Sequence, residues 1–141
     1  MGQEKIILGL LITTLLVACT STPADVENGN GGIVDISETG VHRTIELDGD
    51  VMTVTLHVVL NSGARFYLFE EKLPAGAEFV EADVEKTGDS LKHVIFTDAE
   101  STSYTYKIKV QSGSTIFFDG VYAIDGMDKE AAIKGITEAH T

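Results

Sequence analysis

The stretch Val51-Met52-Thr53-Val54-Thr55-Leu56-His57-Val58-Val59-Leu60 alternates between two kinds of side chain, and this alternation decides the fold. Its even-numbered positions are all apolar, whereas Thr53, Thr55 and His57 lie between them. Successive side chains of a β-strand point to opposite faces, so a period of two predicts a strand that is buried on one side. Residues 104–110 repeat the pattern. We therefore predict two half-buried strands, with Leu56 and Ile108 inward and Thr55 and Lys107 outward.

Weaker strand signals surround these two segments. They cover residues 33–37, 42–47, 65–71, 78–85, 91–97, 115–124 and 131–137. Turn sequences such as Asn61-Ser62-Gly63 and Pro74-Ala75-Gly76 separate them. Short alternating strands with turns between them are typical of antiparallel sheets that each have one wet face. We predict an all-β antiparallel sandwich of about seven to nine strands over residues 33–141, with a closed barrel as the alternative.

The N-terminus carries a different signal. Met1 to Lys5 is followed by the uncharged apolar run of residues 6–18. A helix of this run would reach only about 20 Å, whereas a bilayer core is about 30 Å thick. This pattern predicts a signal peptide over residues 1–18.

Leu16-Val17-Ala18-Cys19 resembles the bacterial lipobox, in which a peptidase cuts before a lipid-modified cysteine. The resemblance implies that Cys19 becomes a lipidated N-terminus and that the protein is exported and anchored to the outer side of a cell membrane. Cys19 is the only cysteine, so no disulfide can form within the chain. The polar, glycine-rich residues 19–32 then read as a flexible tether. The alternative is an uncleaved anchor helix that happens to end at Cys19.

Charge excludes some partners. The chain has 22 acidic residues against 10 Lys and Arg, a net charge of -12. Nucleic-acid binding depends on Lys and Arg that neutralise phosphates, so we predict no nucleic-acid partner.

The order of features resembles the immunoglobulin-like modules of archaeal and bacterial cell-surface proteins. The matching segments are Arg43-Thr44, residues 51–56, Phe69 to Gly76, residues 104–110, Gly120-Val121-Tyr122 and Ile133-Lys134-Gly135. The resemblance implies an immunoglobulin-like sandwich that works as a structural or contact module rather than as an enzyme. Such modules often carry a tryptophan in a middle strand, and Phe96 is expected to take that place here.

Catalytic and metal-binding patterns are weak. The four histidines are scattered, and we interpret them as surface residues. Glu70 and Glu71 are adjacent on a predicted strand, so they point to opposite faces and cannot flank one substrate. The weak metal candidates are Asp48 and Asp50 in one turn and Asp125 and Asp128 in another, where calcium would find carboxylate oxygens. Because Asp and Gly are also ordinary turn residues, we predict no bound metal, no cofactor and no enzymatic activity.

Two functions remain after these exclusions. The favoured one is a surface lipoprotein that contacts another envelope or surface protein. The alternative is a solute-binding or metal-binding lipoprotein that presents its ligand near a transporter. Six aromatic residues could form a sugar-stacking platform or pack in the core, and we favour core packing because the chain has no tryptophan. The set comprises Phe66, Tyr67, Phe69, Phe117, Phe118 and Tyr122.

Overall fold

The computed structural model describes residues 25–27 and 33–141. The predicted signal peptide 1–18, Cys19 and most of the predicted tether 19–32 lie outside the described residues, so these assignments stay predictions. Inside the tether range, β1 (Asp25–Glu27) pairs antiparallel with β2 (Ile33–Asp35). The described residues contain no helix with the length and hydropathy that a membrane span requires.

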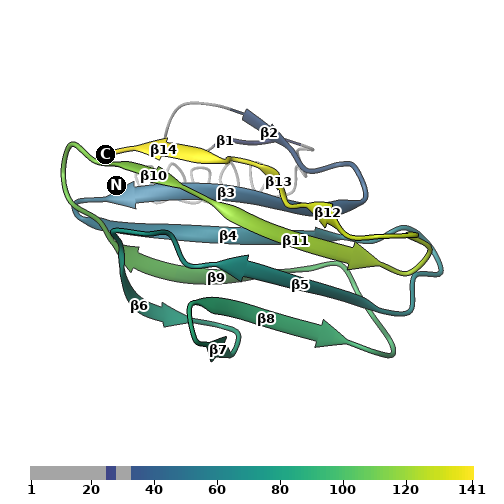
Figure 1. Ribbon diagram of the computed structural model, residues 1–141. Coiled ribbons are helices and arrows are strands. Elements are labelled where there is room, and N and C mark those ends of the chain that lie inside the picture. The colour runs from purple at the N-terminus through teal and green to yellow at the C-terminus, as the bar shows by residue number, and fades with distance from the viewer. Residues whose placement is uncertain (1–24, 28–32) are drawn as a thin grey trace, which may run out of the picture.

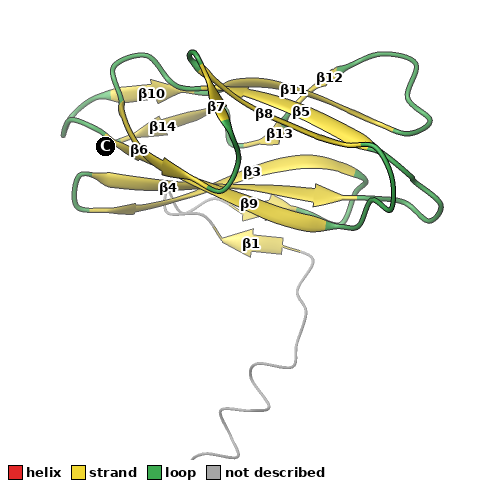
Figure 2. Ribbon diagram, turned by 90° about the horizontal axis from the view of Figure 1, so that it is seen from below, coloured by secondary structure: helices red, strands yellow, loops and turns green. Residues whose placement is uncertain are grey.

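Two five-stranded sheets pack face to face (Figures 1 and 2). The first sheet has the order β13-β3-β4-β9-β6, and the second has the order β12-β11-β5-β8-β7. The strands of the first sheet are β3 (Gly40–Asp48), β4 (Val51–Val59), β6 (Glu78–Ala82), β9 (Thr102–Lys109) and β13 (Lys134–Gly135). Those of the second are β5 (Tyr67–Lys72), β7 (Lys86–Thr87), β8 (Ser90–Ile95), β11 (Asp119–Ile124) and β12 (Ala131–Ala132).

This architecture confirms the predicted all-β antiparallel sandwich. The neighbours β3-β4-β9-β6 follow the A-B-E-D order of an immunoglobulin-like sheet, and β11 beside β5 reproduces its F-C pair. The departure is β8, which lies on the other side of β5. β8 belongs to the β7–β8 hairpin, which the chain inserts between β6 and β9. This hairpin therefore forms one edge of the second sheet.

The predicted strand faces are confirmed. In β4, Leu56 is buried with the other even-numbered residues, whereas Thr55 is only half-buried with its odd-numbered neighbours. Ile108 of β9 is also buried, and Lys107 is half-buried. Apolar residues of the two inner faces form two adjoining clusters, one around Ile108 and the other around Leu56. Alternation along each strand thus places one set of side chains in the core and leaves the other facing outward.

Two predicted strands are each divided because the chain changes partners. The predicted strand 115–124 splits into β10 (Thr115–Phe117) and β11, and β10 pairs with β14 (Glu138–His140), which the sequence did not predict. The predicted strand 131–137 splits into β12, which pairs with β11, and β13, which pairs in parallel with β3. The backbone N–H of Ile133 donates to Gly120 O and that of Ile136 to Arg43 O, so this segment joins the two sheets.

Candidate functional site

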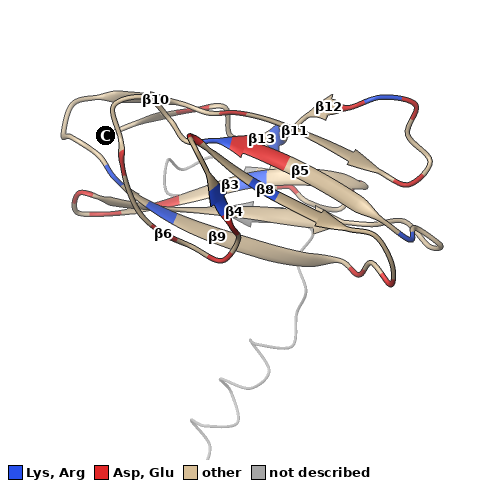
Figure 3. Cartoon of the chain, turned by 60° about the horizontal axis from the view of Figure 1, so that its bottom comes forward, with Lys and Arg blue, Asp and Glu red and all other residues tan. Residues whose placement is uncertain are grey.

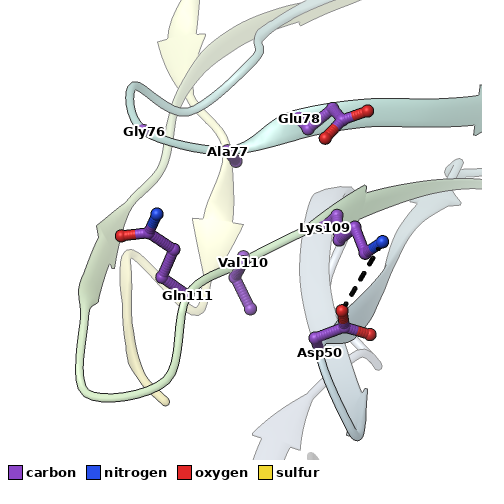
Figure 4. Close-up of a pocket in the computed structure, with 7 residues that line it drawn as sticks. All are labelled: Asp50, Gly76, Ala77, Glu78, Lys109, Val110 and Gln111. Carbon is purple, nitrogen blue, oxygen red and sulfur yellow. Dashed lines mark ion pairs between the residues drawn. The ribbon is translucent and has the colours of Figure 1, made fainter.

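The first acidic turn lies in the β3–β4 hairpin. Asp48 is exposed, and the Asp50 carboxylate lies 3.7 Å from the ammonium of Lys109 (Figure 4). Asp50 and Lys109 line an open cavity of about 460 Å³ together with Glu78 and neighbouring backbone. Lys109 also faces Glu78 across the β6–β9 pair. The carboxylates that line this cavity therefore already face a cation of the protein itself, the ammonium of Lys109.

The second acidic turn follows β11. One oxygen of the Asp125 carboxylate accepts hydrogen bonds from the backbone N–H and the Nε–H of Arg65, both at 3.1 Å. These bonds lower the pKa of Asp125 below its usual range. Asp128 is exposed beside this turn. Among the described residues, no three His, Cys, Asp or Glu side chains gather as a metal ion requires.

Three of the four histidines are less exposed than the sequence indicated, whereas His140 is exposed as expected. His42 is buried, so its assignment to the surface was wrong. The segment that precedes β3 covers it, and the Nε2 of His42 lies 2.7 Å from Glu38 O in that segment. His57 lies opposite His42 across the β3–β4 pair, and its Nε2 lies 2.9 Å from the Thr44 hydroxyl. Loss of water around His57 lowers its pKa, and the nearby His42 lowers it further. These side chains have local structural partners.

A buried ion pair joins the two sheets. Arg43 of β3 and Glu71 of β5 are only 1% and 0% exposed. Arg43 Nε–H donates to one carboxylate oxygen of Glu71 at 2.7 Å, and its Nη2–H donates to the other at 2.5 Å. The Nη1–H donates to Ile136 O at 2.6 Å. Burial raises the pKa of the Glu71 carboxyl, whereas the hydrogen bonds and charge of Arg43 pull it down. This geometry is the two-pronged pairing that guanidinium and carboxylate groups favour.

Two glycines beside this ion pair leave the space that its residues occupy. A Cβ on Gly120 would lie 2.7 Å from the Glu71 carboxylate, and a Cβ on Gly135 would lie 2.4 Å from Arg43 O. The guanidinium carbon of Arg43 lies 5.2 Å from the centre of the Phe118 ring. The pair is thus closed off from solvent and from any substrate. We assign it to the architecture of the core rather than to a reactive site.

Several aromatic residues lie where core packing predicts them. Tyr67, Phe69, Phe118 and Tyr122 are buried, in line with the predicted packing role. Phe96, expected at the position of a core tryptophan, is instead 78% exposed, because it follows the last residue of β8. Phe66 and Phe117 are also exposed, so the core reading is wrong for them.

Exposed apolar side chains gather on the outer face of the second sheet. Leu68 of β5 lies opposite Val94 of β8 and opposite Ala123 of β11, which forms one row across three strands. Phe66 and Phe96 extend this face by one further row, and both line a groove of about 450 Å³. Exposure is 38% for Phe66, 44% for Val94 and 78% for Phe96. We call these five residues the outer patch.

Charges border the outer patch on one side. The next row of the sheet carries Glu70, whose carboxylate lies 3.7 Å from the ammonium of Lys92, and the row after it pairs Lys72 with Asp119 at 3.1 Å. Figure 3 shows the charged residues of β5 at one end of the strand and uncharged residues over the rest. The outer face thus changes from charged to apolar along its strands.

Three loops border the outer patch at its other end. Backbone and side-chain hydrogen bonds connect residues 60–66 with 96–101 and with 125–130. These loops contain five acidic residues against the two basic residues Arg65 and Lys129. Asp98 has a φ of 55°, a left-handed conformation that Asp tolerates better than most residues, and it turns the chain two residues after Phe96. The apolar residues therefore lie beside an acidic rim.

The fold and this surface define an antiparallel immunoglobulin-like sandwich with an exposed apolar area on one sheet. No protein-family model matches the chain, and no curated protein matches it either. A similar solved structure is the cupredoxin domain of amoB from Nitrosocaldus yellowstonii. It shares 15% sequence identity at a TM-score of 0.36, and the similarity covers 62% of this chain. The match covers 54% of that solved chain, so this protein matches about half of its length.

Proposed function

We propose that this protein is a lipid-anchored envelope lipoprotein whose sandwich domain binds another envelope or surface protein through the outer patch. The observation that carries the proposal is the placement of Phe66, Val94 and Phe96 on one exposed face. Large apolar side chains that gather on a surface are typical of contact sites between proteins. The sequence resemblances to a lipobox and to cell-surface modules support the same function.

The alternative of a solute or metal site has less support among the described residues. The groove beside the outer patch is lined by Phe66 and Phe96 with Arg65, Thr97 and Asp98, and the Arg65 guanidinium is already paired with Asp125. A small-molecule site usually has several polar groups that converge on its ligand. Contact with an apolar partner surface is the better match.

Photocrosslinking from Phe96 tests the contact. We expect a photoreactive phenylalanine analogue at position 96 to give one dominant protein adduct in intact cells of the host, because this side chain is the most exposed member of the outer patch. Adducts are measured as shifted bands on an immunoblot and identified by mass spectrometry. The substitution Val94→Lys should remove the adduct, because a charge would lie against the partner's apolar surface.

Phe117 provides the matched control. Phe117 is a second phenylalanine with a largely exposed side chain, at 65% exposure. It is the last residue of β10 and lies just before Asp119, the first residue of β11, which pairs with Lys72 at the end of the sheet far from the outer patch. The analogue at position 117 should give no such adduct. Equal adducts from both positions, or none from position 96, would contradict a specific contact at the outer patch.

Replacement of Cys19 with serine tests the anchor. We expect the Cys19→Ser variant to lose all incorporation of labelled fatty acid, because a serine hydroxyl is a far weaker nucleophile than the thiolate that forms the thioether. Metabolic labelling followed by immunoprecipitation measures this directly. Ser21→Ala is the control and should keep the label. Persistent labelling of Cys19→Ser would rule out the lipobox assignment.

A further inference from the structure

Strand β8 leaves part of its backbone without a partner strand. On one side it pairs with β5 over its full length, from Ser90 to Ile95. On the other side β7 pairs only with Ser90 and Leu91. In the part of the chain that the structure describes, no further strand continues this pairing. The second half of β8 is therefore an open sheet edge.

The hydrogen-bonding pattern shows which residues of β8 present their backbone to this edge. The N–H of Leu73 donates to Asp89 O at 2.7 Å on the β5 side, and the N–H of Lys92 donates to Glu85 O at 3.3 Å on the β7 side. Alternate residues of a strand direct their N–H and C=O groups to the same side. The even-numbered residues thus face away from β5, and Val94 directs both its N–H and its C=O to the open edge.

This edge lacks the protection that sheet edges usually have. Exposed edge strands in proteins commonly carry charges, prolines or bulges that prevent pairing with another chain. Lys92 is the only Lys, Arg, Asp or Glu residue of β8, it precedes the open half, and its ammonium lies 3.7 Å from the Glu70 carboxylate. The residues that follow are Val94 and Ile95, and then Phe96. These types favour strand pairing.

The side chains around the edge define what a partner strand would carry. An added strand would place alternate side chains beside Val94 and Phe96 on the outer face. Its other side chains would lie over His93 and Tyr104, whose rings are 4.6 Å apart at the open side of the sandwich. The neighbouring loops have an excess of acidic residues, so basic residues at the ends of the added strand would find opposite charge.

We propose that β8 accepts an extended segment of the partner as an added strand, with apolar side chains at alternate positions and basic residues at its ends. The inference rests on the proposed function, because it names how a partner would engage the outer patch. Strand addition gives affinity through main-chain hydrogen bonds and specificity through alternate side chains. The acidic rim makes a basic peptide of another protein a better occupant than a second copy of this acidic chain.

A designed peptide tests strand addition with the purified full chain. The probe has seven residues, in which valine and threonine alternate between two terminal lysines. Binding is measured by fluorescence titration, and hydrogen exchange by NMR reports on single amides. We expect the Val94 amide to exchange fast in the free protein and to be protected when the peptide is added. The His93 amide, which faces β5, should be protected throughout.

Two methylated peptides separate strand addition from side-chain contact. Methylation of the valine nitrogens, which would face β8, should weaken binding about tenfold or more, whereas methylation of the threonine nitrogens should leave it nearly unchanged. The substitution Val94→Pro removes the open N–H at a position where an edge strand tolerates proline, and it should weaken binding similarly. Val94→Thr keeps the N–H and is the control.

Three results would overturn the inference. Equal binding of both methylated peptides would show contact without strand addition and would leave the proposed function intact. No binding of the unmethylated peptide, together with a specific crosslink from Phe96, would exclude strand addition but keep the outer patch as an interface. Protection of Val94 that rises with protein concentration in the absence of peptide would identify a second copy as the occupant.

Discussion

Replacement of Arg43 with methionine is expected to lower the free energy of unfolding by about 3 to 5 kcal/mol. The substitution removes the only cation that contacts the Glu71 carboxylate among the described residues, and Glu71 is fully buried. A carboxylate that loses its partner inside a protein keeps the full cost of leaving water. Ile136 O would also lose the hydrogen bond from Arg43. Urea denaturation, followed by circular dichroism, measures the change.

The double variant Arg43→Met/Glu71→Leu is the control for this prediction. It removes both charges and replaces them with apolar side chains of similar length, so we expect it to recover most of the lost stability. The difference between the single and double variants isolates the cost of an unpaired buried charge from the cost of altered packing. If the single variant is as stable as the original chain, the pair is not buried as described.

The two central strands could be predicted from the sequence because the alternation of apolar and polar side chains is visible within each strand, without knowledge of its partners. In β4, each odd-numbered residue of the predicted pattern is more polar or more exposed than the even-numbered ones, and the structure places them accordingly. The same reasoning separated Glu70 from Glu71, and the two do point to opposite sides of the sheet. Periodicity therefore reveals which side of a strand is buried without any knowledge of its neighbours.

The division of the predicted strands at 115–124 and 131–137 depends on partners that lie far away in the sequence. The N–H of Phe118 still donates to Thr137 O in the register of the β10–β14 pair, whereas Asp119 pairs with Lys72 of β5. The later segment changes sheet in the same way, because Ile133 donates to Gly120 O and Ile136 donates to Arg43 O. Nothing in the local pattern of these segments signals a change of sheet. The short strand β14 was missed for the same reason, since its residues Glu138–His140 show little alternation.

The two most informative features of the molecule were not predicted as such. Arg43 appeared only within a family resemblance, and no spacing in the sequence shows that it meets Glu71, which lies 28 positions further along the chain. Phe96 was expected in the core, but the end of β8 and the turn at Asp98 place it outside. One available signal was the acidic Thr97-Asp98-Ala99-Glu100 segment that follows Phe96, because it marks the exposed end of a strand.

Truncation of Leu56 to alanine is expected to lower the free energy of unfolding by about 2 to 5 kcal/mol. Leu56 is buried on the inner face of β4 and packs in the cluster that contains Phe69 and Tyr122. Removal of its methyl groups leaves a cavity, and strands on both sides limit how far the structure can relax. Ile108→Ala should have a similar effect in the other cluster, because Ile108 occupies the equivalent inward position of β9.

The neighbouring Thr55→Ala substitution provides the comparison within the same strand. Thr55 faces outward and is half-buried between Thr44 and Thr105, so its truncation should cost well under about 1 kcal/mol. All three variants can be compared by urea denaturation with a common slope, since none should change the surface exposed on unfolding. The decisive quantity is the ranking, because an absolute loss depends on how each cavity collapses. A larger loss for Thr55→Ala than for Leu56→Ala would mean that β4 is turned over, with its even-numbered residues outside, and would place the core on the opposite face of this sheet.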